Sequence, residues 1–114
     1  MKSKVYFSSK ITKESVLNLY KILNFKLKGN VAIKVHSGEP GNQNFLRPEF
    51  WEDIINEVNG TVVECNTAYE GRRNTTKKHL LTFQEHGWNA FNVDLLDASG
   101  PDLKLDILNG KIIK

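Results

Sequence analysis

Cysteine, arginine and long apolar runs are all scarce in this sequence of 114 residues. A single cysteine, Cys65, excludes an internal disulfide and offers too few ligands for a structural zinc ion or an iron–sulfur cluster. No apolar run approaches the roughly 18 residues that cross a membrane, and the opening MKSKVYFSSK lacks the apolar centre of a signal peptide. We therefore expect a soluble, cytoplasmic protein with no membrane partner and no metal site of its own.

Positive charge is mild and dispersed along the chain. The net charge is +3, and 13 lysines and 3 arginines are scattered without forming a basic block. Such a block would indicate a nucleic-acid partner, so none is expected. The composition, with 39% hydrophobic and 25% charged residues, is typical of one globular domain.

Helical and β-type patterns alternate along the chain. Apolar residues recur at helical spacing after Thr12, after Pro48 and after residues 74–76, which predicts three helices. Four β-branched or aromatic runs are expected to be strands: residues 5–7, 31–36, 61–65 and 90–96. This strand–helix–strand alternation predicts a three-layer α/β/α domain with a mostly parallel sheet of about four strands.

The C-terminal residues carry a hairpin signal. Residues 103–108 and 111–114 flank Asn109-Gly110, which favours a type I′ turn. The chain stops inside the second of these strands, so we expect residues 1–114 to be a single domain from the N-terminal part of a longer protein. An unpaired strand at this edge invites self-association.

Two connections are unusually long. Residues 37–47 and 66–74 follow the second and third expected strands, whereas connections in α/β units usually have about 2–6 residues. The turns at the opposite edge, such as Asn59-Gly60, are minimal. Ligands of open α/β sheets bind at the carboxyl ends of the strands, so the long connections predict a binding edge.

Strand periodicity places polar side chains at that edge. Lys34 and His36 share one face of their strand, and Glu64 and Asn66 share one face of the next. In a matching register Lys34 meets Glu64, with His36 and Asn66 at the rim. The alternative is a purely structural Lys34–Glu64 ion pair beside a partly buried His36.

All three arginines precede expected helices at the same edge. Arg47 precedes the second helix, and Arg72 and Arg73 precede the third. A helix N-terminus and a bidentate guanidinium both suit oxyanions, so these residues form a candidate anion clamp. The alternative is that the arginines tether loops through carbonyl groups and Glu39 or Glu70.

The stretch GEPGNQN contains glycines that would allow backbone N–H groups to approach an anion, although a turn-rich loop has the same composition. No metal site is predicted, since only His36 and His79, with Cys65 or Glu64, would converge. No catalytic residue is assigned. The expected ligand-binding residues are Lys34, His36, Gly38, Glu39, Gly41, Asn42, Arg47, Glu64, Asn66, Thr67, Arg72 and Arg73.

Five stretches carry a family resemblance: KVYF (4–7), VAIKVHSGEPGN (31–42), FLRPEF (45–50), ECNTAYEGRRNT (64–75) and HLLTFQEHGW (79–88). In this order and spacing, residues 4 to about 95 resemble the family catalogued as "domain of unknown function 362", often labelled uncharacterised iron–sulfur-centre proteins. Family members commonly read DTNT where this chain reads ECNT at 64–67. Glu64 thus stands where the family has an aspartate, which keeps the carboxylate but places it on a longer side chain.

The resemblance implies a longer parent protein, because many family members carry ferredoxin-like cysteine motifs downstream. An iron–sulfur cluster would then lie in a missing downstream region. The leading hypothesis is a ligand-binding N-terminal domain of a cytoplasmic iron–sulfur protein or enzyme, with an anionic small molecule at the sheet edge. The alternative is a non-catalytic module whose polar edge docks a downstream domain. The family implies no reaction, and enzyme activity is left open.

Overall fold

The computed structural model describes residues 2–100, 103, 106, 108, 109 and 111, and these residues form a mixed α/β fold. Strands β1 (Ala32–Lys34), β2 (Thr61–Glu64) and β3 (Val93–Leu95) form a parallel sheet in the order β1-β2-β3. The helices are α1 (Lys13–Leu23), α2 (Pro48–Val58), α3 (Thr76–Glu85) and the short 3₁₀ helix η1 (Trp88–Ala90). The three predicted helices are confirmed, and three of the predicted strands are confirmed with shorter bounds.

The helix boundaries follow from local sequence chemistry. The Thr12 side chain caps α1 by accepting a hydrogen bond from the backbone N–H of Ser15, and the Ser15 side chain accepts one from the backbone N–H of Thr12. Pro48 occupies the first position of α2, where its missing N–H costs nothing. Asn59 ends α2 in the left-handed conformation with φ 47°, and the Thr75 side chain caps α3.

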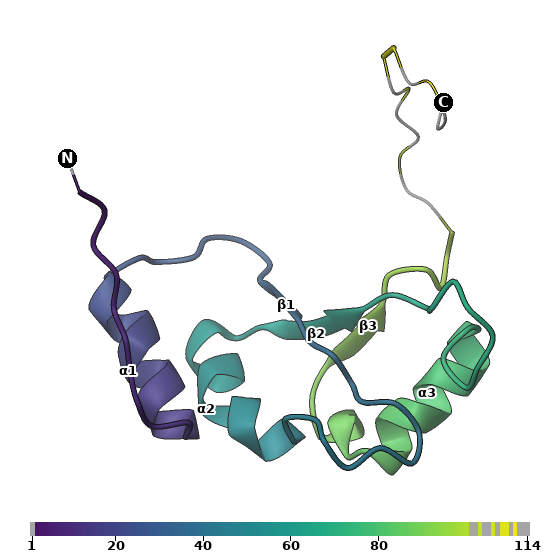
Figure 1. The fold of residues 1–114 in the computed structure, drawn as a ribbon, viewed down its shortest axis with the longest axis horizontal. Helices are drawn as coiled ribbons and strands as arrows, with labels where there is room; N and C mark the ends of the chain where they lie inside the picture. The colour runs from purple at the N-terminus through teal and green to yellow at the C-terminus, as the bar shows by residue number, and fades with distance from the viewer. Residues whose placement is uncertain (1, 101–102, 104–105, 107, 110, 112–114) are drawn as a thin grey trace.

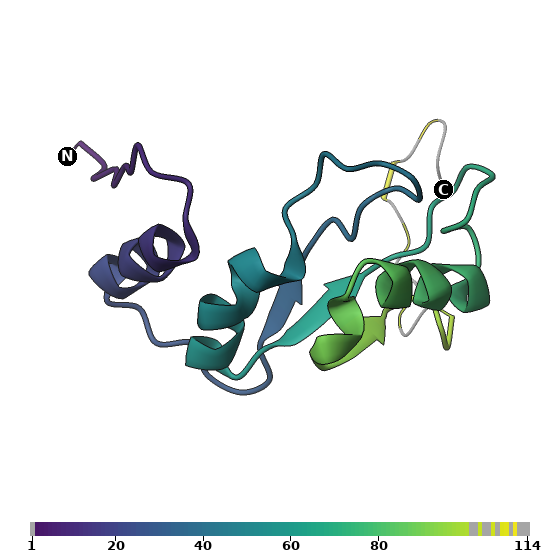
Figure 2. The ribbon, with the colours of Figure 1, turned by 90° about the horizontal axis from the view of Figure 1, so that it is seen from below.

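Helices α2 and α3 lie on the same face of the sheet, below the strands in Figure 1 and in front of them in Figure 2. Neighbouring parallel strands that follow one another in one direction, joined by right-handed crossovers, place successive helices on one side. The core lies between this face and the helices. It contains Val35, Ile55, Val62, Phe83, Trp88 and Leu95. Helix α1 packs against α2 at the end of the molecule away from α3 (Figure 1).

Several finer predictions about the fold are not confirmed. The opposite face of the sheet carries no helix in the described part of the chain, so the three-layer arrangement is not seen there. Residues 5–7 form no strand, and the Val5 and Phe7 side chains are 87% and 86% exposed, because this short run finds no strand to pair with. The predicted hairpin falls mostly outside the described residues. Within the described ranges, no helix is long and apolar enough to cross a membrane.

The strand register decides which side chains face the helices. Lys34 lies beside Val63, and Glu64 lies beside Leu95. Because side chains alternate along a strand, Lys34 and Glu64 leave the sheet on opposite faces. The prediction that they share a face is therefore wrong by one residue of register. Packing Val35 beneath the helices together with Leu95 brings Glu64 to the core side.

Candidate functional site

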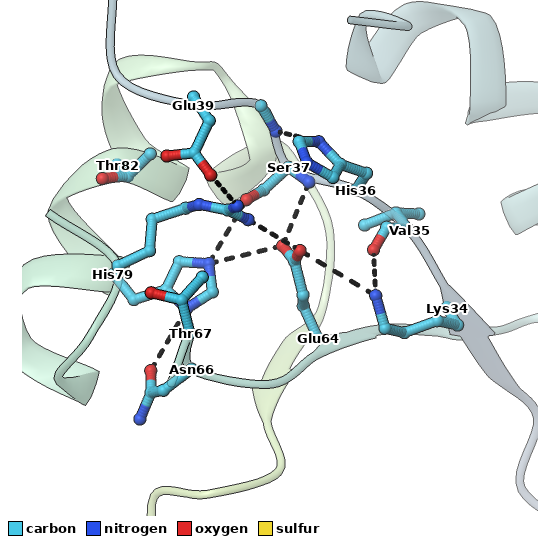
Figure 3. Close-up of polar contacts among 12 residues, drawn as sticks. Lys34, Val35, His36, Ser37, Glu39, Glu64, Asn66, Thr67, His79 and Thr82 are labelled. Atoms are coloured by element: carbon cyan, nitrogen blue, oxygen red, sulfur yellow. Dashed lines mark hydrogen bonds and ion pairs between the residues drawn. The ribbon is translucent and has the colours of Figure 1, made fainter. Parts of the chain in front are cut away.

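A buried carboxylate lies at the carboxyl end of the central strand. Glu64 is only 4% exposed. Its Oε1 accepts a hydrogen bond from Nη1 of Arg73 at 2.9 Å, and its Oε2 accepts one from the backbone N–H of Ser37 at 3.0 Å (Figure 3). His79 Nε2 lies 3.3 Å from the same Oε2. A buried carboxylate is tolerated only with such partners, so Glu64 organises the residues around it.

Arg73 links the two long loops that follow β1 (residues 35–47) and β2 (residues 65–75). Its side chain is 4% exposed, and its Nη2 donates to the Glu39 carboxylate of the first loop and to the Tyr69 hydroxyl of the second. The Tyr69 hydroxyl donates to Glu39 at 2.6 Å. Hydrogen bonds from Arg73, and then from Tyr69, hold the pKa of Glu39 below its usual value. Arg73 thus tethers both loops to the end of β2.

His79 of α3 completes the buried cluster. The ring is fully buried, with Nδ1 3.2 Å from Oδ1 of Asn66 and Nε2 3.3 Å from Oγ of Ser37 (Figure 3). Burial lowers the pKa of His79, and the positive charge of Arg73 lowers it further, against the opposing effect of Glu64. The ring is therefore neutral at neutral pH. We call Glu39, Glu64, Arg73 and His79 the ionic cluster.

The turn after β1 is clamped from several directions. The carbonyl oxygen of Ser37 accepts hydrogen bonds from His86 Nδ1 at 2.8 Å and from the Trp88 indole at 3.1 Å. Gly38 has φ 93°, and a Cβ atom there would lie 2.7 Å from the Phe45 ring. That ring stacks on His86 with centroids 4.5 Å apart. Only glycine fits this position, so the path of the first loop is strongly specified.

The predicted Arg72–Arg73 anion clamp does not form. Arg73 is directed into the ionic cluster, where its charge is shared by two carboxylates. Arg72 lies at the surface, 52% exposed, and pairs with Glu85 of α3. The predicted Lys34–Glu64 ion pair exists only at 3.8 Å, because Lys34, 60% exposed, starts from the opposite face and reaches around the end of β1.

The other side of the first loop borders an open cavity of about 390 Å³ beside α2. We call this cavity the loop pocket. It is lined by His36, Asn42, Asn44, Phe45, Leu46 and Trp51. None of these lining residues is acidic.

Hydrogen bonds within the loop use the acceptor atoms of His36 and Asn42 and leave their donors for a ligand. The backbone N–H of Gly38 donates to His36 Nδ1 at 3.1 Å, which leaves the proton of a neutral His36 ring on Nε2. The backbone N–H of Asn44 donates to Asn42 Oδ1 at 2.7 Å, which leaves the Asn42 amide NH₂. The described residues provide no partner for His36 Nε2 or Asn42 Nδ2.

The predicted site residues therefore divide into separate groups. The ionic cluster and its contacts contain Glu39, Glu64, Asn66 and Arg73, while the loop pocket contains His36 and Asn42 with Arg47 over the Phe45 ring. Thr67 donates its N–H to the Arg73 carbonyl oxygen, so its contact is structural. Gly38 lies buried between the groups, and Gly41 is exposed with φ 80°.

Sequence reasoning missed several residues that build the site. They are Ser37, Phe45, Trp51, Tyr69, His86 and Trp88. His79 was considered only as a metal ligand. In the part of the chain that the structure describes, no group of three or more His, Cys, Asp or Glu residues is placed to hold a metal ion. Helical spacing does place His79 and Phe83 on one face of α3, and this was the signal that could have identified a buried histidine.

No protein-family model matches the chain, and no curated protein or solved structure is significantly similar to it. The resemblance carried by the five stretches therefore stays a prediction.

Proposed function

We propose that this chain is a binding module that takes a small anionic ligand in the loop pocket. The observation that carries the proposal is the direction of the hydrogen bonds. His36 Nδ1 and Asn42 Oδ1 are used within the loop, so each of these two side chains has a donor left over. Donors in a pocket that has no acidic lining residue favour a ligand that brings acceptor atoms and negative charge. The Glu39 carboxylate lies near His36 but is already paired with Arg73.

Two further features support an anion at this position. The Arg47 guanidinium lies 4.2 Å from the centroid of the Phe45 ring, which lines the loop pocket, and donates to the Gln43 side chain at 2.6 Å. Helix α2 begins at Pro48, immediately after this loop, and Trp51 of its first turn lines the pocket. The positive end of the helix dipole therefore lies beside the pocket, although the Glu49 carboxylate in the same first turn offsets part of it.

The ionic cluster gives the pocket a fixed shape. Glu39 and Ser37 belong to the same loop as His36 and Asn42, and both are bonded to groups outside that loop. A loop that is already ordered loses less conformational entropy when a ligand binds. The cluster thus acts by positioning, and the pocket provides the contacts.

The wider role remains part of the proposal. On the family resemblance, the module is the N-terminal part of an iron–sulfur protein or enzyme, and the ligand is bound for its chemistry. The competing function is a non-catalytic module whose polar edge docks a downstream domain. That function requires no anion affinity in the loop pocket, so a binding measurement separates the two.

The test is a titration of the chain with inorganic phosphate, followed by amide chemical shifts. Shifts are expected in residues 36–46, and His36→Ala or Asn42→Ala should weaken binding about tenfold or more, as loss of a bond to a charged group does. Arg72→Ala is the matched control, since Arg72 pairs with Glu85 and lies outside the pocket. Equal phosphate affinity in all three variants would overturn the proposal.

A further inference from the structure

We infer that the ligand of the loop pocket is an organic anion with an apolar body, rather than a free inorganic anion. This inference rests on the proposed function. It starts from the size of the pocket, about 390 Å³, which lies in the range of about 300–1,000 Å³ that holds whole organic ligands. A phosphate or carboxylate group alone would leave most of that space filled with water.

The lining has two chemical halves. The three polar side chains, His36, Asn42 and Asn44, come from the loop that follows β1. The apolar Leu46 comes from the end of that loop, Trp51 comes from the first turn of α2, and Leu46 is 45% exposed. An anionic group at the polar half would therefore leave its attached body beside Leu46 and Trp51.

The Phe45 ring lines the pocket but offers little surface to the apolar body of a ligand. His86 stacks on one face of the ring at 4.5 Å between centroids, and the Arg47 guanidinium lies 4.2 Å from the ring centroid. These two groups are too bulky to share one face, so both faces of Phe45 are covered and only its edge is left for a ligand. Leu46 and Trp51 remain as the apolar surface that a ligand body would bury.

The ligand class follows from these halves: a phosphate ester or carboxylate attached to a ring or a branched hydrocarbon. Burial of the body displaces water from Leu46 and Trp51, which inorganic phosphate cannot do. The matched probes are phenyl phosphate and inorganic phosphate, because they share the anionic group and differ only in the body.

The experiment measures both affinities on the complete chain by calorimetry. Phenyl phosphate is expected to bind at least about tenfold more tightly than inorganic phosphate. Leu46→Ala should weaken phenyl phosphate binding about three- to tenfold and leave inorganic phosphate binding unchanged. Leu80→Ala is the control, because Leu80 is 49% exposed on α3, outside the pocket lining, and should alter neither affinity.

The outcomes separate the two proposals. Equal affinities for the two probes would overturn the apolar body and leave the anion site standing. Tight phenyl phosphate binding that Leu46→Ala does not weaken would also overturn the inference, because the body would then lie elsewhere. Failure of both probes to bind would overturn the proposed function, and the inference with it.

Discussion

The two sides of the first loop, residues 35–47, use their polar groups in opposite ways. On the buried side, formed by the ionic cluster, the half-buried Glu39 bonds to Arg73 and the Ser37 backbone N–H bonds to Glu64. On the open side, His36 and Asn42 accept hydrogen bonds from backbone N–H groups of the same loop, and their N–H donors stay free among the described residues. Charge density is higher on the buried side, whereas the free donors of His36 and Asn42 lie on the open side. The clustered charges at this edge of the sheet therefore hold the loops in place, and they are poor indicators of which residues would contact a ligand.

The neighbouring arginines make the same point within two residues. Arg73 is 4% exposed and bonded to two carboxylates, whereas Arg72 is 52% exposed and bonded to one surface glutamate. Breaking a buried pair costs far more than breaking an exposed one, because the remaining charge cannot regain water. Replacing each arginine in turn should therefore change the stability of the protein by very different amounts.

The largest expected effect is that of Arg73→Met. It leaves Glu64 buried without its main counter-charge and should lower the free energy of unfolding by about 3–5 kcal/mol, measured by urea denaturation. Arg72→Met is the control and should cost about 0–1 kcal/mol. Adding Glu64→Gln to Arg73→Met should recover part of the loss. If the two single variants are equally stable, the ionic cluster does not hold the loops.

The next effect concerns the glycines of the first loop. Gly38 and Gly41 both have positive φ, 93° and 80°, but an added Cβ meets the Phe45 ring only at Gly38. Both alanine variants carry the backbone strain of about 1 kcal/mol. Gly38→Ala should cost a further 1–3 kcal/mol or so from overpacking, and it should also weaken phosphate binding by shifting Phe45. Thermal melting and a phosphate titration check this, and equal melting temperatures for the two variants would contradict the clamp.

Much of the fold was predictable because local chemistry determines it. Thr12, Pro48 and Asn59 mark helix ends through capping, a missing N–H and the left-handed conformation, none of which needs tertiary information. The long connections were also predictable, because loop length is visible in the sequence, and the binding edge inferred from them stays a prediction. The strand predicted at residues 5–7 is not formed, since a strand needs a neighbouring strand to pair with as well as β propensity.

The site was less predictable because it depends on register and on the direction of single side chains. One residue of register moved Lys34 to the face opposite Glu64. Nothing local indicates which of Arg72 and Arg73 turns inward. Ser37 was overlooked because it acts mainly through its backbone N–H and carbonyl oxygen, which every residue possesses.

The smallest expected effect is the response of the buried side to mild acid. The pKa of His79 is lowered by burial from its usual 6.5, so below pH 6.5 the unfolded chain binds a proton before the folded one. Stability therefore falls as the pH drops from 6.5 toward the folded pKa. The pKa of Glu39 is lowered from 4.5 by Arg73, so its contribution is present above 4.5 and is lost only at more acidic pH.

Two stages of acid destabilisation should follow, and His79→Gln should remove only the first. The measurement is the urea midpoint between pH 8 and pH 3, compared at each pH for the unmodified chain and the variant. Glutamine keeps a neutral hydrogen-bonding group at the position of the ring. Any loss of packing should lower the urea midpoint equally at every pH, whereas loss of the titrating group should change how the midpoint depends on pH. If the variant retains the full decline between pH 6.5 and 5, the titrating group is not His79. The decline would then come from another group of the chain.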